Sequence, residues 1–137
     1  LREVIQHEMG HVVTVSGVEP PDHWLVEGIA EYIGMQPRSA PETYSRLVLQ
    51  NMRPPFAMVP KALGAAASDE KAAEFYALSH YAVECMARKY GETAMLAFVR
   101  LRLREDQSRD DAARAAFDRP FAAVEKTCST WIRGQAR

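Results

Sequence analysis

Hydrophobic residues recur at helical spacing along most of the chain, and no stretch alternates between apolar and polar positions as a strand would. Residues 1–16 are apolar on nearly every face, which predicts a buried helix that ends at Gly17. Asp22 is a plausible N-cap for a second helix over residues 23–34. We therefore expect a mostly or wholly α fold. The spacing predicts further helices over residues 41–51, 69–90, 92–104, 108–117 and 120–133.

Local signals also mark where the helices stop. Gly91 follows the long segment 69–90, with Lys89 in its last turn, which is typical of a helix end. Residues 53–67 contain three prolines and two short apolar clusters, so we expect an irregular loop that packs on the body of the domain. Trp131 and Ile132 are expected to dock the last helix. Together these features predict one domain over residues 1–137.

Composition excludes some classes of function. The chain has 137 residues, of which 47% are hydrophobic and 26% charged, and its net charge is −1. A chain without a basic excess lacks the electrostatic footprint of a nucleic-acid-binding protein. The basic run at 100–104 is followed by Glu105, Asp106, Asp110 and Asp111, which predicts a solvated, charge-balanced helix end. No apolar stretch is long enough to span a membrane.

The two cysteines, Cys85 and Cys128, are too few for a disulfide framework or a cysteine-based zinc site. Two free thiols in the core are the favoured interpretation, and a single disulfide is the alternative. The chain begins with Leu1, and its first motif starts only six residues later. We therefore expect a fragment of a longer protein, accompanied by an upstream segment of the same chain.

The first motif is His7-Glu8-Met9-Gly10-His11. Residues four apart on a helix differ by about 40° of rotation and about 6 Å of rise, so both imidazoles leave the same face. Two such nitrogens can bind one ion, and Glu8 is placed to reach a water bound to it. This is the H-E-x-x-H pattern of zinc hydrolases. The alternative is a helix that merely carries two histidines.

A catalytic zinc site needs a third protein ligand, and the second predicted helix offers one. In WLVEGIAEY, Glu27 and Glu31 are four residues apart, share one face and stand among apolar residues. Carboxylates are costly to bury unless they are paired or bound to a metal. Antiparallel packing of the first two helices would bring Glu27 against His7 and His11. The alternative is a solvated stripe on an amphipathic helix.

HEMGH, followed after fifteen residues by the glutamate of WLVEGIAEY, resembles the gluzincin class of metallopeptidases. The chain is most similar to the bacterial peptidase-MA-like domains, with their H-E-x-x-H and W-L-x-E-G-x-A-E-Y signature. FYALSHYAVECMARKYG resembles the tyrosine-containing helix of that group, and AFDRPFAAVEKTCSTWIRG resembles its final helix. The resemblance is strong at 7–11 and 24–32 and looser elsewhere. It also favours an extracytoplasmic bacterial location.

The resemblance implies a role for each residue of the two motifs. His7, His11 and Glu27 would be the ligands of one zinc ion per chain. Glu8 would be the general base and later the proton donor. Glu31 would hold a zinc-bound histidine by its other nitrogen, a contact that such ligands need in order to fix their tautomer.

The chain departs from the gluzincin pattern in two ways. The spacing between His11 and Glu27 is shorter than in the best-known members, so the connecting loop must be tight. Gluzincins also carry a β-sheet before the active-site helix, and only six residues precede HEMGH here. We therefore expect the helical C-terminal portion of a zincin-like domain that lacks its preceding sheet.

The oxyanion of a peptidase needs a further hydrogen-bond donor. Tyr76 and His80 are four residues apart on one face of the predicted helix 69–90, and either could supply it. The resemblance favours Tyr76. The alternative is that both are packing residues. Trp24 is expected to pack the corner of the first two helices, and His23 to be a surface residue.

These observations predict a zinc-dependent hydrolase that cleaves peptide bonds of a peptide or protein substrate. A non-catalytic binding or scaffold domain with the same fold is the alternative, and the intact Glu8 speaks against it. A third hypothesis is a plain helical interaction domain without metal, in which the ligand-like spacings would be a coincidence. Hydrolysis of a non-peptide amide or ester would use the same site chemistry.

Overall fold

The computed structural model describes residues 22–35, 44–53, 56–61, 63 and 66–137. Every regular element in that part of the chain is a helix, so the expected all-α fold is confirmed. The helix predicted over residues 1–16 lies outside the described residues. The helices are α2 (His23–Met35), α3 (Tyr44–Gln50), α4 (Asp69–Tyr90), α5 (Glu92–Leu103), α6 (Arg109–Phe117) and α7 (Phe121–Gln135).

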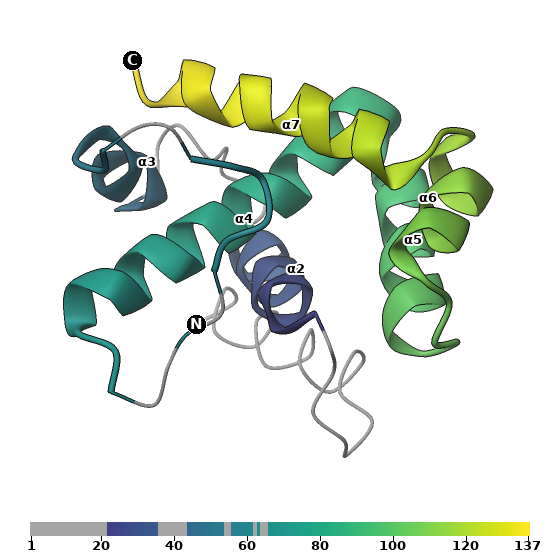
Figure 1. Ribbon diagram of the computed structural model, residues 1–137, viewed down its shortest axis with the longest axis horizontal. Coiled ribbons are helices and arrows are strands. Elements are labelled where there is room, and N and C mark those ends of the chain that lie inside the picture. The colour runs from purple at the N-terminus through teal and green to yellow at the C-terminus, as the bar shows by residue number, and fades with distance from the viewer. Residues whose placement is uncertain (1–21, 36–43, 54–55, 62, 64–65) are drawn as a thin grey trace.

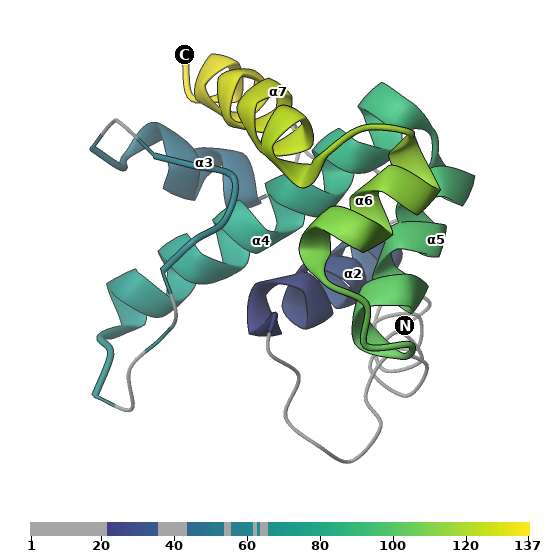
Figure 2. The same ribbon diagram turned by 45° about the vertical axis from the view of Figure 1, so that its right-hand side comes forward.

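The longest helix, α4, runs through the middle of the molecule (Figure 1). Helices α3 and α7 lie along one side of it and α2 crosses the other side, an arrangement that both views show (Figure 2). Helix α5 follows directly after α4, and α6 packs between α5 and α7. Because α4 contacts α2, α3, α5 and α7, it is the central element, and α6 is held by α5 and α7.

Short polar signals set the helix boundaries. Ser68 Oγ accepts a hydrogen bond of 3.2 Å from the amide of Lys71 and caps α4. Ser108 does the same for α6, accepting from the amide of Asp111 at 3.1 Å. At the other end of α4, Gly91 has a φ of 96°, a backbone conformation that residues with a Cβ rarely adopt. The predicted bounds of α4 are thus confirmed.

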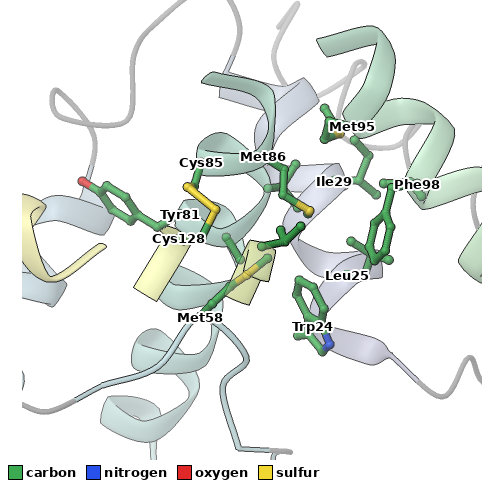
Figure 3. Packing of buried hydrophobic residues seen from close by; sticks show 14 of the residues in the cluster. Trp24, Leu25, Ile29, Met58, Tyr81, Cys85, Met86, Met95, Phe98 and Cys128 are labelled. Atoms are coloured by element: carbon green, nitrogen blue, oxygen red, sulfur yellow. A yellow bond between two sulfur atoms is a disulfide. The ribbon is translucent and has the colours of Figure 1, made fainter. Parts of the chain in front are cut away.

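Buried hydrophobic side chains of α2, α4 and α5 pack together in the core (Figure 3). Leu25 and Ile29 of α2 pack near Met86 of α4 and Phe98 of α5, each with at most 1% of its surface exposed. Burying a side chain of this size stabilises the fold by roughly 1.5–3 kcal/mol. Ile132 of α7 is fully buried in the same cluster, so the expected docking of the last helix is confirmed.

Helices α2 and α4 approach each other closely at Gly28. A Cβ at this position would overlap the carbonyl oxygen of Ser79 and would lie 2.6 Å from Val83 Cγ2. Only glycine therefore lets the two helix backbones come this close. The crossing places Glu27 and Glu31, on either side of Gly28 in the sequence, beside α4.

Cys85 of α4 and Cys128 of α7 form a disulfide, with their Cα atoms 5.7 Å apart. The interpretation of these residues as two free thiols is therefore wrong. Each residue is fully buried, and the distance is typical of a disulfide, for which Cα atoms lie roughly 4.4–6.8 Å apart. The packing of α7 against α4 brings the two sulfurs together, and sequence spacing carries no signal for that.

The hydrogen bonds of Asp22 at the start of α2 also differ from the expectation. The backbone carbonyl of Asp22 accepts the amides of Leu25 and Val26, as at the beginning of a helix. Its carboxylate, expected to cap the helix, accepts hydrogen bonds from the guanidinium groups of Arg102 and Arg109. Arg102 therefore belongs to a buried ion pair, whereas Arg100 matches the predicted solvated helix end.

No helix in the described part is long and apolar enough to cross a bilayer.

Candidate functional site

The residues predicted to do chemistry divide into two groups. The HEMGH stretch, residues 7–11, lies outside the part of the chain that the structure describes. Glu27 and Glu31 of α2 and Tyr76 and His80 of α4 lie inside it. These four come from two helices that pack directly against each other.

The two glutamates of α2 lie beside Tyr76 of α4. Burial raises the pKa of Tyr76, and the negative charges of Glu27 and Glu31 raise it further. Because an ordinary phenol already has a pKa of about 10, Tyr76 is protonated at neutral pH and can donate a hydrogen bond. With 40% of its surface exposed, Tyr76 is also reachable from solvent. The crossing of α2 over α4 thus brings three predicted site residues together.

His23, expected at the surface, contacts a predicted ligand. Its Nε2 lies 3.2 Å from Glu27 Oε1, and its ring lies 5.6 Å from the ring of Phe75. The side chain of His23 is 44% exposed, as expected, whereas that of Glu27 is only 14% exposed. The sequence carries a signal for this contact, because His23 and Glu27 are four residues apart and such residues are neighbours on one helix face.

His80 is fully buried, although it lies one helical turn from Tyr76. A hydrogen bond of 3.0 Å joins its Nδ1 to the hydroxyl of Ser45 in α3. On the other side, its Nε2 lies 3.7 Å from Glu84 Oε1, a distance for an ion pair and not for a hydrogen bond. This environment favours a packing role that joins α3 to α4 over a role as oxyanion donor.

Glu84 completes the buried polar chain that begins at Ser45. Its Oε2 accepts a hydrogen bond of 3.3 Å from Arg88. Burial by itself would raise the pKa of Glu84, but His80 and Arg88 together hold it below its usual value. The carboxylate is therefore ionised at neutral pH inside the protein. Glu84 has a signal in the sequence, since His80 and Arg88 lie four residues to either side of it on α4. Ser45 has none, because it meets His80 across 35 residues.

A cavity of about 370 Å³ opens next to Tyr76, between α2, α3 and α4. Glu31, Ser45 and Asp69 contribute its polar lining, and three alanines of α4 contribute small apolar side chains. Space of this size beside Tyr76 and Glu31 is large enough to admit part of a ligand, since ligand pockets hold roughly 300–1,000 Å³.

The donor set predicted for a metal is two imidazoles and one carboxylate, from His7, His11 and Glu27. Sets of this composition fit zinc in catalytic sites. Of the three, only Glu27 is described, and its side chain is largely shielded from solvent, as suits a ligand. The described residues contain no group of three or more His, Cys, Asp or Glu side chains that could hold a metal without the HEMGH stretch.

No protein-family model, curated protein or solved structure gave a significant match to the chain. Functional inference therefore depends on the HEMGH motif and on the arrangement of Glu27, Glu31 and Tyr76.

Proposed function

We propose that the chain is a zinc-dependent peptidase of the gluzincin type. The observation that carries the proposal is that Glu31 and Tyr76 line the same cavity and that the charges of Glu27 and Glu31 both act on the Tyr76 phenol. The sequence motifs assign these residues separately to a metal ligand, a histidine-orienting carboxylate and an oxyanion donor. Their meeting at one helix crossing is what such a site requires, and a solvated stripe of glutamates would not need it.

The chemistry of the donor set supports one zinc per chain, held by His7, His11 and Glu27. When bound, zinc supplies a Lewis acid that acidifies a water molecule and polarises the substrate carbonyl. Glu31 lies one turn beyond Glu27 and in this proposal would accept the second ring N–H of a ligand histidine, which would fix its orientation.

Glu8 and Tyr76 act on the substrate in this proposal. Glu8 accepts a proton from the attacking water and then delivers it to the leaving amine. The water oxygen joins the carbonyl carbon, and the C–N bond breaks to give a carboxylate and a free amine. Tyr76, whose phenol is protonated at neutral pH, donates a hydrogen bond to the oxyanion as it develops.

The first experiment is metal content by mass spectrometry on the purified chain and on the variants His11→Ala and Glu27→Gln. We expect about one zinc per chain in the parent, and a strong loss in both variants. Glu70→Gln is the matched control, since Glu70 is exposed on α4. A parent chain that binds no zinc even with excess metal would overturn the proposal.

The second experiment separates a peptidase from a scaffold that keeps the metal. Hydrolysis of a fluorogenic protein substrate is compared between the zinc-loaded parent and Glu8→Gln. Loss of hydrolysis with zinc retained in the variant would support the role of Glu8. A parent that holds zinc and cleaves neither peptides nor simple esters would instead favour the non-catalytic binding domain.

We also propose that the chain works in an extracytoplasmic compartment. Support comes from the buried disulfide between Cys85 and Cys128, because disulfides form and persist in oxidising compartments and are rare in the cytosol. Expression of the chain with and without an export signal, followed by thiol labelling of the unreduced protein, tests this. Stable folding only in the exported form is the expected result.

A further inference from the structure

A second cavity, of about 700 Å³, lies on a different face of α4, under the segment between α3 and α4. Its volume is within the range of small-ligand sites, roughly 300–1,000 Å³. Its interior is largely apolar. The side chains that form this interior are Met52, Phe56, Val59, Leu63, Phe75 and Leu78.

The lining of this cavity also includes cations. Arg53, Lys61 and Lys71 contribute to it, with Glu74 as the only acidic residue among the described lining. Lys71 Nζ lies 3.5 Å from Glu74 Oε1, so the charges of these two side chains largely neutralise each other. Arg53 and Lys61 are exposed, and neither is paired with a carboxylate within the described part of the chain. The cavity therefore offers an apolar interior and two uncompensated positive charges.

Two further cavities along the described part of α4 have the opposite charge. The one beside Tyr76 is lined by Glu31 and Asp69, and the third by Asp69, Glu70 and Glu74. Neither has a lysine or arginine among its described lining residues. An anion approaching α4 would therefore be repelled by two cavities and attracted by the one that carries Arg53 and Lys61.

The apolar cavity lies close to the proposed zinc ligand. Phe75, which lines the cavity, packs its ring 5.6 Å from the ring of His23. His23 Nε2 in turn lies 3.2 Å from Glu27 Oε1. Only two side chains thus separate the cavity from the Glu27 carboxylate.

We propose that this cavity binds the apolar C-terminal residue of a peptide, with the free carboxylate of that residue held by Arg53 and Lys61. The inference rests on the proposed peptidase function and specifies it. A peptidase with this subsite removes single apolar amino acids from carboxyl ends. The apolar side chain is buried against Phe75 and Leu78, and the charge of the carboxylate selects chain ends over internal residues.

The test measures binding separately from cleavage. The Glu8→Gln variant, which does not turn over substrate in the proposed mechanism, is titrated with acetyl-Ala-Ala-Phe as the free acid and as the C-terminal amide. We expect the acid to bind roughly tenfold more tightly, since hydrogen bonds to a charged group are stronger than those to a neutral one. Acid and amide that bind equally would overturn the inference.

Variants assign the preference to this cavity. Arg53→Gln and Lys61→Gln, each at an exposed position, are expected to reduce the preference for the acid several-fold. Lys126→Gln, an exposed cation on α7, is the matched control and should leave it unchanged. A preference that survives the Arg53→Gln, Lys61→Gln double variant would overturn the assignment of the carboxylate to these two residues.

The outcomes distinguish this inference from the proposed function. Selective binding of the acid by a chain that cleaves nothing would remove the peptidase and leave the cavity assignment standing. Cleavage at internal bonds, with no preference for a free carboxyl end, would remove the inference and leave the peptidase. Decanoate that binds more tightly than the peptide acid and displaces it would identify a fatty acid as the occupant, which also overturns the inference.

Discussion

Arg109 Nη2 donates a hydrogen bond of 2.6 Å to Asp22 Oδ1 and so joins the start of α6 to the start of α2. The carboxylate side chain of Asp22 is 2% exposed, and Arg102 donates to its other oxygen at 2.9 Å. This buried ion cluster fixes the end of α2 that leads to Glu27. It is therefore the contact through which α5 and α6 support the candidate site.

Replacing Asp22 by Ala is expected to lower the free energy of unfolding by about 3 kcal/mol, because it leaves two guanidinium groups without their shared anion. Urea unfolding followed by circular dichroism measures the change. Glu105→Ala removes the exposed partner of Arg100 and serves as control, with an expected loss of about 0.5 kcal/mol or less. Equal losses in the two variants would contradict the role given to Asp22.

The contribution of Asp22 should depend on pH. Burial would raise the pKa of Asp22, but Arg109 and Arg102 together hold it below its ordinary value. A carboxylate with a lowered folded pKa stabilises the protein fully above its unfolded pKa, about 3.9, and loses this contribution as pH falls through the folded pKa. The stability difference between the parent and Asp22→Asn should therefore be constant from pH 7 to pH 5 and shrink below about pH 4. A difference that stays unchanged at pH 3 would contradict this.

The disulfide between Cys85 and Cys128 should be structural. Replacing both cysteines by alanine is expected to lower the free energy of unfolding by about 2–4 kcal/mol, because the cross-link no longer restricts the unfolded chain. Reductant should lower the midpoint temperature of thermal unfolding of the parent and leave that of the double variant unchanged. Alkylation of two thiols in unreduced, denatured parent protein, seen by intact mass, would show that the bond is absent.

Tyr76→Phe should lower kcat by roughly 10²–10³-fold if Tyr76 stabilises the oxyanion. Its zinc content should stay equal to that of the parent, since the hydroxyl is not a predicted ligand. Tyr90→Phe is the matched control, because the buried hydroxyl of Tyr90 has no hydrogen-bond partner among the described residues. Steady-state kinetics on a zinc-loaded sample measure both variants. An unchanged kcat in Tyr76→Phe would assign the oxyanion donor elsewhere.

Gly28→Ala should push α2 away from α4, because its Cβ would overlap the carbonyl oxygen of Ser79. We expect a loss of about 1–3 kcal/mol in unfolding free energy and weaker zinc binding, since Glu27 moves with the helix. Gly134→Ala in α7 is the control, where a Cβ meets nothing within 4 Å. That change should leave the protein unchanged or stabilise it by up to about 1 kcal/mol. Weaker zinc binding in the Gly134 variant would point to an indirect cause.

Most helix boundaries could be predicted because they depend on residues close in sequence. Ser68 and Ser108 cap their helices through an amide three residues later, and Gly91 ends α4 through its own backbone freedom. Leu25 and Ile29 of α2 are both buried and lie four residues apart, a spacing that places them on one helix face. These are local effects, and they operate wherever the helix packs.

The candidate site could be predicted only in part. The spacing of Glu27 and Glu31 indicated a shared helix face, and the resemblance indicated Tyr76. The contact of His23 with Glu27 also had a spacing signal, yet its significance appears only when the burial of Glu27 is known. Ser45, in contrast, meets His80 across 35 residues of sequence, and no local pattern marks such a pair.

Local sequence was thus enough to predict an all-helical chain, its helix ends and the residues with metal-ligand spacing, because backbone capping and helical periodicity act over a few residues. Tertiary packing decided which of those residues meet. It joined Cys85 to Cys128 and directed the Asp22 carboxylate to Arg102 and Arg109 instead of to a helix cap. The physical reason is that buried charges and thiols take the partners that the crossing of distant helices supplies, and those crossings depend on the shape of the whole core.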